Sequence, residues 1–486
     1  MNKEVKDESK EQVSVTLRIY NSMSRQVEEF VPLTPGKVNM YVCGPTVYDY
    51  IHIGNARPMI FFDVVRRYLE YKGYEVNFIV NFTDVDDKII RKAEQMGITV
   101  PEVAEKFIAA YIEDREALGV KPPTHTPRVT ETLPEIIAFI EELVRKGYAY
   151  ESGGDVFFRT HLFPEYGKLS HKNLDELQYG IRVEVDQRKE NPQDFVLWKA
   201  AKPGEIKWPS PWGEGRPGWH IECSVMALRY GGRTLDIHGG GQDLQFPHHE
   251  CEIAQSESLT GQTFARYWMH NGFVNMNNEK MSKSLGNVIT VKEILKRTNP
   301  QAVRYLMLNA HYRSPLNFTE ETLRQAENSV QRLANCRDNL KHRLSAVQTD
   351  LPVTLSDEDK AVLSRLDELK KAFEAHMDDD FGTPDAITVW FMTVSEANAY
   401  LQRPVAHPQV LQAFLDQMAV MDGVLGLLPP EAGAELLDEE IEALIAERAA
   451  ARRERNFARA DEIRNLLAQR GIILEDTPQG VRWKRK

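Results

Sequence analysis

The sequence predicts an α/β fold in which a doubly wound parallel sheet with an insertion is followed by a helical bundle and a small C-terminal domain. Lys37–Val42 and Glu75–Asn81 are short, largely apolar runs with the length of buried strands. Between them, from about Gly54, apolar residues recur at helical spacing, and Gly73 follows the last of them as a helix-ending glycine would. Such a strand–helix–strand unit opens a nucleotide-binding sheet.

Three domains and a tail are expected along the 486 residues. Residues 1–14 are charged and mixed in sign, and we expect a disordered tail there. A Rossmann-like catalytic domain is expected at 15–290, with an insertion at about 95–200 where the sheet pattern is interrupted. Residues 291–428 have an almost wholly helical pattern and are expected to form the bundle domain. Residues 434–486 are expected to form the small C-terminal domain.

Further elements are predicted inside the catalytic domain. The insertion contains two amphipathic helical stretches, Pro101–Leu118 and Thr130–Lys146, and a hairpin-like segment, Tyr148–Phe158. Beyond the insertion, Thr234–His238 and Tyr267–Asn271 have the pattern of strands that complete the sheet.

Composition limits the cellular setting and the partners. No apolar run approaches the ~18 residues that a membrane-spanning helix needs, and the first residues lack the apolar stretch of a secretory signal, so we expect a cytoplasmic protein with no membrane partner. The four cysteines are then unlikely to form disulfides. The net charge of -12 argues weakly against nucleic acid, but residues 441–486 hold eleven Lys or Arg against seven Asp or Glu. That basic end can meet RNA.

His52–Asn55 lies where the loop after the first strand enters its helix. The start of a helix offers unpaired backbone N–H groups and a positive dipole end, which together bind anions. Gly54 lets a ligand approach closely, and His52 can donate a hydrogen bond to a phosphate. The alternative is a capping loop with an incidental histidine.

Lys280–Ser284 places two lysines around a small, Ser-containing loop after the second half of the sheet. Lysines there can neutralise charge that develops on transferring phosphate oxygens. The alternative is a solvated loop, since most lysines lie at the surface.

Together these two segments resemble the HIGH and KMSKS signatures of class I aminoacyl-tRNA synthetases. The resemblance implies catalytic roles for His52, Asn55, Lys280 and Lys283. It implies an ATP site formed by His52, Gly54, Asn55, Lys280, Met281, Ser282, Lys283 and Ser284. Asn55 stands where the first signature has its second histidine. An Asn side chain still donates hydrogen bonds, so activity is expected to survive, but the role of Asn55 itself is in doubt.

Four further residues form a candidate zinc set. Cys43 precedes His52 by nine residues, Cys223 lies far along the chain, and His248 and Glu252 share a predicted helix face at i, i+4. Taken singly, each Cys is better explained as a small buried hydrophobe, and His248 as a hydrogen-bonded structural residue.

The sequence segments around these residues favour a zinc site instead. Gly218–Cys223, His238–Asp243 and Pro247–Glu250 closely resemble the zinc-binding region of cysteinyl-tRNA synthetases. That family uses Cys, Cys, His and Glu as zinc ligands, and the matching positions are Cys43, Cys223, His248 and Glu252. Cys251 and Cys336 have no such role in the pattern.

By the same resemblance, one zinc ion per chain would lie in the cysteine pocket. Zinc binds a thiolate far better than a hydroxyl, which would separate cysteine from serine without an editing domain. The residues expected to line this pocket are Thr83, Trp219, His238 and Asp243. The alternatives are that Trp219 belongs to the core and that Asp243 is a turn residue.

The resemblance covers nearly the whole chain and implies a cysteine–tRNA ligase activity. ATP, with Mg²⁺, activates L-cysteine to cysteinyl-adenylate, and the cysteinyl group passes to the 3′ end of cysteine tRNA. The C-terminal domain would read the anticodon, with Trp483 either stacking on a base or packing the closing hairpin. We expect a monomer.

Three alternatives stay open from the sequence. A cysteine ligase with an amino-sugar acceptor keeps the adenylate chemistry but needs no anticodon domain. A catalytically inactive, RNA-binding paralogue is supported by Asn55 alone. A structural zinc protein would not need the nucleotide motifs.

Overall fold

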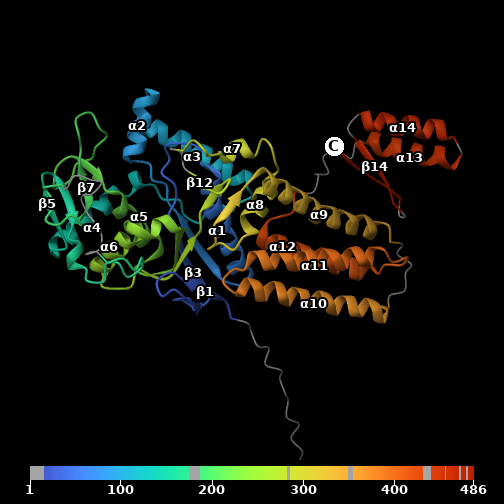
Figure 1. The fold of residues 1–486 in the computed structure, drawn as a ribbon, viewed down its shortest axis with the longest axis horizontal. Coiled ribbons are helices and arrows are strands. Elements are labelled where there is room, and N and C mark those ends of the chain that lie inside the picture. The colour runs from blue at the N-terminus through green and yellow to red at the C-terminus, as the bar shows by residue number, and fades with distance from the viewer. Residues whose placement is uncertain are drawn as a thin grey trace, which may run out of the picture. The chain divides into compact units, whose positions relative to one another are not determined.

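The computed structural model describes residues 16–173, 186–281, 285–347, 354–430, 439–454, 456–469, 472–477 and 480–485. They fall into two compact units, the first made of residues 1–326 and 373–387 and the second of residues 327–372 and 388–486 (Figure 1). The expected tail at 1–14 lies outside the described residues, as do Ser282, Lys283 and Ser284.

The first unit is built on a four-stranded parallel sheet with the order β10-β9-β3-β4. Its strands are β3 (Lys37–Val42), β4 (Glu75–Val80), β9 (Leu235–Gly241) and β10 (Ala265–Asn271). The first crossover leads from β3 outward to β4, and the last leads from β9 outward to β10 in the opposite direction. The chain therefore reverses its winding between β3 and β9, and such a switch point opens a ligand crevice at the carboxyl ends of the strands.

Helices cover both faces of this sheet. α1 (Ile53–Tyr71) packs where Gly239 leaves room, since a Cβ at that position would lie 2.4 Å from the Phe62 ring. α5 (Trp219–Gly231) and α6 (Glu250–Thr260) share a buried core with Tyr41 and Ile79 on the other face. The predicted end of α1 is confirmed: Gly73, at φ +94°, follows the last turn and donates its N–H to the Glu70 carbonyl.

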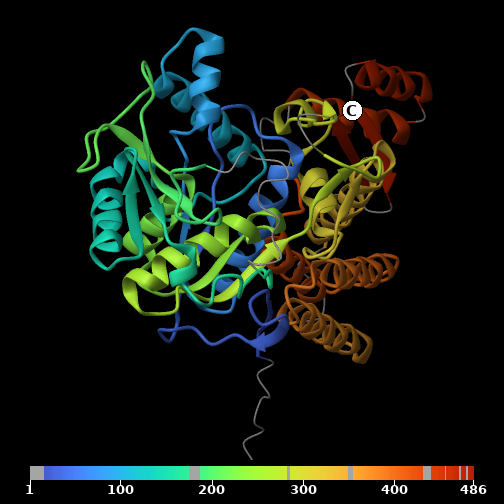
Figure 2. The same ribbon diagram turned by 60° about the vertical axis from the view of Figure 1, so that its left-hand side comes forward.

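The insertion is larger than a pair of helices and a hairpin. The expected helices are present as α3 (Val100–Ala117) and α4 (Leu133–Arg145), and the hairpin is present as β5 (Ala149–Ser152) and β6 (Asp155–Phe158). Two strands that the sequence did not reveal, β7 (Phe195–Ala200) and β8 (Gly215–Pro217), extend the hairpin into a four-stranded antiparallel sheet. This sheet and α4 pack on α5 and α6 through one core (Figure 2).

The remaining elements of the first unit are short. β1 (Arg18–Asn21) and β2 (Gln26–Glu29) form a hairpin, and α2 (Asp87–Met96) begins at the capping side chain of Asp86. β11 (Val274–Met276), β12 (Glu279–Lys280) and β13 (Leu316–Phe318) form a small sheet, while α7 (Val291–Ile294) and α8 (Pro300–Leu308) follow Lys280. β13 is a short strand within the largely helical region at 291–428, and it pairs with β11, a partner distant in sequence.

Long helices dominate the second unit. α9 (Glu320–Ser345), α10 (Asp357–Asp378), α11 (Thr383–Leu401) and α12 (Pro408–Leu425) lie side by side (Figure 1). Ser356 caps the start of α10, because its hydroxyl accepts the Asp359 N–H at 3.1 Å. Among the residues that the structure describes, none of the helices combines the length and apolar character that crossing a bilayer requires.

The C-terminal segment has a small core of its own. α13 (Glu439–Arg453) and α14 (Phe457–Gln469) pack against the hairpin of β14 (Ile472–Thr477) and β15 (Gly480–Arg485). The closing hairpin expected from the sequence is thereby confirmed.

Candidate active site

A cleft of about 400 Å³ lies at the carboxyl ends of the parallel strands, where the switch point places it. Most of the described residues that the sequence singled out reach this cleft. They are Cys43, His52, Gly54, Asn55, Trp219, Asp243, Lys280 and Met281. Thr83 and His238 are buried beside it and are not among its lining residues.

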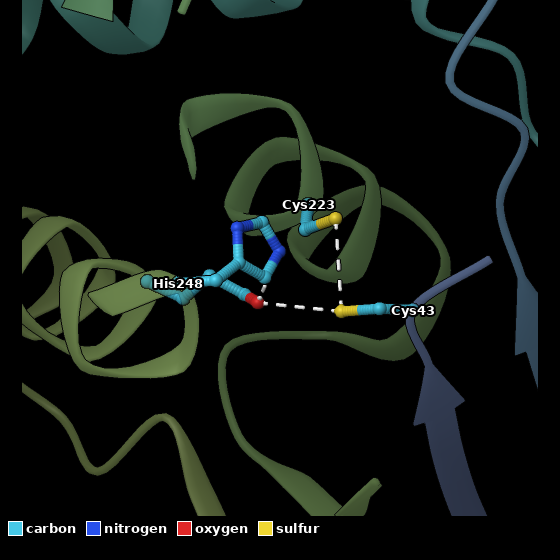
Figure 3. A group of neighbouring side chains, drawn as sticks. Cys43, Cys223 and His248 are labelled. Atoms are coloured by element: carbon cyan, nitrogen blue, oxygen red, sulfur yellow. Dashed lines mark hydrogen bonds and ion pairs between the residues drawn. The ribbon is translucent and has the colours of Figure 1, made fainter. Parts of the chain in front are cut away.

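Four potential metal ligands converge beside this cleft, and Cys43 is the one of them that lines it. Figure 3 shows Cys43, Cys223 and His248. Cys43 follows the last residue of β3, Cys223 lies in the second turn of α5, and His248 and Glu252 flank the start of α6. Their ligand atoms all lie within 4.8 Å of one another. Three different elements are therefore needed to assemble the group.

The spacing of these atoms fits a zinc ion. Tetrahedral ligands with Zn–S of about 2.3 Å and Zn–O of about 2.0 Å lie about 3.8 Å apart for two sulfurs and about 3.5 Å apart for sulfur and oxygen. The Cys43 and Cys223 sulfurs are 3.9 Å apart, and the Cys43 sulfur is 3.5 Å from Glu252 Oε1. His248 Nε2 is buried without a hydrogen bond, 3.1 Å from the same oxygen.

A second set of potential ligands, Cys43, His238, His249 and Glu252, overlaps the first. His238 Nε2 lies 2.8 Å from Glu252 Oε2. The other carboxylate oxygen, Oε1, faces Cys43 and His248. His249 Nδ1 is 2.8 Å from His270 Nε2. We therefore assign His238 and His249 to the support of the cluster, where the partners of a ligand fix its orientation.

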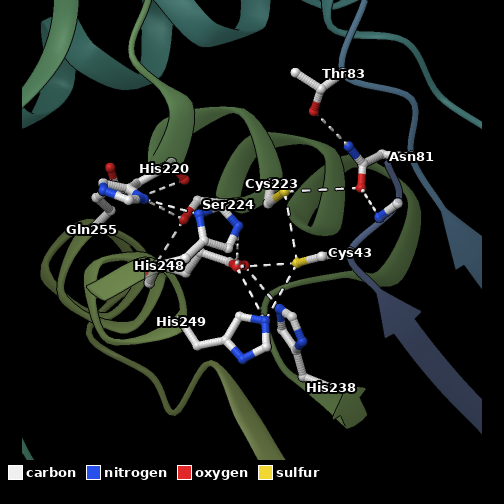
Figure 4. A network of polar contacts seen from close by, with 12 residues as sticks. Cys43, Asn81, Thr83, His220, Cys223, Ser224, His238, His248, His249 and Gln255 are labelled. Carbon is white, nitrogen blue, oxygen red and sulfur yellow. Dashed lines mark hydrogen bonds and ion pairs between the residues drawn. The ribbon is translucent and has the colours of Figure 1, made fainter. Parts of the chain in front are cut away.

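This support includes residues that sequence reasoning missed (Figure 4). His220 Nδ1 lies 2.9 Å from His248 Nδ1, and Gln255 donates to the His220 carbonyl. His270 continues the histidine chain to the Ser22 hydroxyl at 2.7 Å. His249, beside His248, and His220, within Gly218–Cys223, stand in segments that the sequence analysis singled out, but no pattern pointed to Ser22, because only folding brings it to the cluster.

The members of the cluster set one another's charge. Burial lowers the pKa of His248, but the charges of Glu252 and Cys223 outweigh it and raise this pKa to about 10. Burial raises the pKa of Glu252, yet His238 and His248 hold it at about 2. The hydrogen bond from Cys43 lowers the pKa of the Cys223 thiol to about 6. A proton on His248 thus lies between a thiolate and a carboxylate, and a bound metal ion would displace it.

Asn81 joins the cluster to the expected cysteine pocket. Its Oδ1 accepts the Gly44 N–H at 2.8 Å, and its Nδ2 donates to the Thr83 hydroxyl at 3.3 Å. Only glycine fits at position 44, because a Cβ there would lie 1.6 Å from the Asn81 carbonyl oxygen. Trp219, 42% exposed, stacks on the His248 ring with centroids 4.3 Å apart, so it lines the cleft and is not a core residue.

The other side of the cleft begins at the N-terminus of α1. His52 is the capping residue, and its N–H donates to Asn55 Oδ1 at 3.1 Å. Backbone hydrogen bonds from Ile53 to the Ile289 carbonyl and from Val291 to the Ile51 carbonyl connect this turn to the segment that follows Lys280. The Lys280 ammonium lies over the Phe273 ring, 4.2 Å from its centroid. The start of α1 is thus held through the backbone to residues 289–291, which follow the second motif in the chain.

Comparisons with known proteins agree with this geometry. The model of the tRNA synthetases class I (C) catalytic domain matches residues 29–328, the DALR domain matches 372–429, and the cysteinyl-tRNA ligase anticodon binding domain matches 434–483. A cysteine–tRNA ligase of Bacillus cereus (strain AH187) is 58% identical over 471 residues, which are 97% of this chain and 100% of the relative. The corresponding enzyme of Anoxybacillus flavithermus is 56% identical with the same coverage.

Solved structures show the same fold at low sequence identity. A methionyl-tRNA synthetase of Mycobacterium tuberculosis in complex with methionyl-adenylate has a TM-score of 0.60 and 16% identity, covering 81% of this chain and 90% of the other. A LeuRS–tRNA complex of Agrobacterium radiobacter has a TM-score of 0.59 and 13% identity, covering 82% and 85%. The full-length relatives and the matched domains together lead to one conclusion: this chain belongs to the cysteine–tRNA ligase family of class I aminoacyl-tRNA synthetases.

Proposed function

We propose that this chain activates L-cysteine with ATP in the cleft of its parallel sheet and transfers the cysteinyl group to the 3′ end of cysteine tRNA. One observation carries the proposal: a single cleft joins Cys43 of the thiolate, imidazole and carboxylate cluster to the N-terminus of α1 and to Lys280. A thiol-binding site therefore lies beside an anion-binding site.

One zinc ion held by Cys43, Cys223, His248 and Glu252 would supply a Lewis acid that binds a thiolate strongly and a hydroxyl weakly. The chain's own residues prepare this set before any ligand arrives. His238 fixes one oxygen of Glu252, and His220 together with Trp219 fixes the ring of His248. Because cysteine and serine have nearly the same shape, contacts of ordinary kind separate them poorly, and the cluster carries the selection.

The nucleotide side is proposed to act by position and charge. His52, Gly54 and Asn55 place the free end of α1 beside the triphosphate, and Lys280 and Lys283 neutralise its oxygens, with Met281, Ser282 and Ser284 forming the rest of the loop and Mg²⁺ accompanying ATP. The cysteine carboxylate attacks the α-phosphorus and pyrophosphate leaves. The 2′-hydroxyl of the terminal adenosine then attacks the carbonyl carbon of the adenylate, and AMP leaves. No side-chain nucleophile is needed.

Thr83, Trp219, His238 and Asp243 are proposed to surround the substrate cysteine. Trp219 and Asp243 line the cleft, which supports direct contact. His238 is hydrogen-bonded to Glu252, so we propose that it acts on the substrate through the metal site and not by direct contact. Thr83 is buried and bonded to Asn81, so its contact with substrate is the least direct of the four.

The C-terminal domain is proposed to contact the anticodon. Trp483 packs against the small core of this domain and donates its indole N–H to Glu442 at 2.8 Å, which favours the packing role over base stacking. Phe457, at the start of α14, is 60% exposed. An exposed aromatic ring is a platform on which an unstacked base can bind, and we propose Phe457 for that role.

Residues 434–483 match the anticodon-binding family. This match argues against the amino-sugar alternative, because an amino-sugar acceptor has no anticodon to read. The inactive-paralogue alternative depended on Asn55, whose side chain here satisfies a backbone N–H at the helix start, a role compatible with an active enzyme. We propose a cytoplasmic monomer; light scattering coupled to size exclusion tests the assembly state.

The test is cysteine-dependent exchange of pyrophosphate into ATP, with serine as the control substrate and metal content measured on the same sample. We expect strong exchange with cysteine, little with serine, and about one zinc per chain. Charging of cysteine tRNA then identifies the acceptor. A folded, metal-loaded protein that shows no exchange would contradict the proposal.

A further inference from the structure

Tyr41 carries a polar group that the proposed mechanism does not use. Its side chain is fully buried, and its hydroxyl makes no hydrogen bond of ordinary geometry among the described residues. It lies near the carboxyl end of β3, two residues before Cys43, so the two side chains leave the strand on the same face. Its neighbours across the sheet are Ile79 on β4 and His238 on β9.

The Tyr41 side chain lies beside the candidate metal cluster. Tyr41 and Cys223 belong to the same buried core, against which Cys43 packs. Tyr41 also pairs across the sheet with His238, whose Nε2 lies 2.8 Å from Glu252 of the cluster. Its ring also contacts the ring of His238, with centroids 5.3 Å apart. The phenol therefore packs against the cluster from the side of the sheet.

Cys43 and His248 would bind the metal themselves and cannot then donate to Cys223, and its other polar neighbours are acceptors. Asn81 Oδ1 lies 3.8 Å from the Cys223 sulfur, and the Gly44 N–H fixes that amide with its oxygen toward the sulfur. Glu252 would bind the metal as a carboxylate, which accepts hydrogen bonds. A sulfur that ligates a metal as thiolate accepts hydrogen bonds and donates none, so neither group can support it. A hydroxyl both donates and accepts, and that of Tyr41 has no competing partner.

We propose that Tyr41 is a positioning residue for the metal site, whose hydroxyl donates a hydrogen bond to the Cys223 sulfur when that sulfur binds the metal. The inference rests on the proposed zinc site and adds a residue to it. Such a bond holds the sulfur in place and withdraws electron density from it, which adjusts the strength of the thiolate as a ligand. The competing explanation is core packing alone, for which Phe would serve better, since an unpaired buried hydroxyl opposes folding.

The experiment compares the parent protein with Tyr41→Phe after cobalt(II) is loaded in place of zinc. Three quantities are measured: the wavelength of the sulfur-to-cobalt charge-transfer band, the metal affinity against a competing chelator, and the thermal unfolding of the metal-free protein. We expect a band shifted to longer wavelength, metal binding about tenfold weaker, and an unfolding temperature that does not fall. Packing alone predicts no change in band or affinity, and that result would overturn the proposal.

A matched control is Tyr267→Phe, in β10 of the same sheet. Its hydroxyl donates to the Glu29 carbonyl at 2.7 Å, and Glu29 is not part of the cluster. This variant should therefore lose stability and keep the parent's band and metal affinity. A second substitution keeps the test independent of folding: 3-fluorotyrosine at position 41 has nearly the same size and is a stronger donor, so it should shift the band to shorter wavelength. No shift there would also count against the proposal.

The outcomes separate this inference from the proposed function. A parent protein whose cobalt form lacks any thiolate charge-transfer band would refute the metal site itself. A parent with the band, and a Tyr41→Phe variant indistinguishable from it, would refute only the role of Tyr41.

Discussion

The two sides of the cleft are built in opposite ways. On the side of the proposed metal site, Cys223, His248 and Glu252 are at most 2% exposed, and every candidate ligand is held by a second side chain or by the end of a strand. On the nucleotide side, Asn55 and Lys280 are exposed, and the order comes from backbone pairing around Ile53 and Val291. Selection of a thiol depends on ligand distances within tenths of an ångström, whereas charge neutralisation tolerates movement.

This difference predicts how each side of the cleft should respond to substitutions. A preassembled cluster loses its function when one ligand changes, because the remaining groups cannot move to replace it. On the nucleotide side, which consists of backbone N–H groups and long cationic side chains, each charge removed should lower the reaction rate by a further step.

The largest effect is expected from Cys223→Ser. A serine hydroxyl is a poor zinc ligand, so metal should be lost and cysteine-dependent exchange should fall by about 10³–10⁴-fold, while the fold persists. Exchange kinetics, metal content and circular dichroism measure the three quantities. Cys251→Ser is the control, because that buried thiol lies outside the cluster and contacts Tyr166. Full activity of the metal-free Cys223 variant would contradict the inference that the metal cluster selects the thiol.

Lys280→Ala should reduce the rate of adenylate formation by about 100-fold and leave the metal content unchanged, because the ammonium is proposed to act on phosphate charge alone. Single-turnover formation of cysteinyl-adenylate measures it. Lys296→Ala, an exposed lysine on the next segment, is the matched control. Loss of metal in the Lys280 variant would show that the two sides are coupled in a way the geometry does not indicate.

The same contrast between packed and exposed groups applies to the C-terminal domain. Phe457→Ala should lower kcat/KM for tRNA charging by about 5–50-fold and leave pyrophosphate exchange unchanged, as expected for one stacked base. Trp483→Ala should instead lower the thermal stability of this domain, because the indole packs on its core. If both variants only lost stability, Phe457 would have no role in RNA binding.

The smallest effect is expected from Asn55→His, which restores the residue of the signature. His Nδ1 can accept the His52 N–H that Asn55 Oδ1 accepts now, so exchange should change by less than about threefold. Steady-state exchange with varied ATP measures it. A gain of about tenfold or more would mean that Asn55 limits the enzyme and would give the nucleotide side a sharper requirement than we infer.

Sequence patterns sufficed wherever the signal was local. β3, α1 and β4 follow from apolar spacing and a terminal glycine, and all three are present. β7, β8 and β13 were missed because each is short and is defined by partners distant in the chain. Their residues have no period of their own that identifies a strand.

The sequence by itself determined the chemistry of the site: which thiols, imidazole and carboxylate are available, and which lysines follow the sheet. Tertiary structure alone showed that two overlapping sets of candidate ligands lie within 4.8 Å, that His238 contacts Glu252 and His220 contacts His248, and that Tyr41 and Cys223 share a core. The physical reason is distance. Residue identity fixes which atoms can bind a metal, but only the crossing of β3, α5 and α6 brings atoms nearly two hundred residues apart to within a few ångströms.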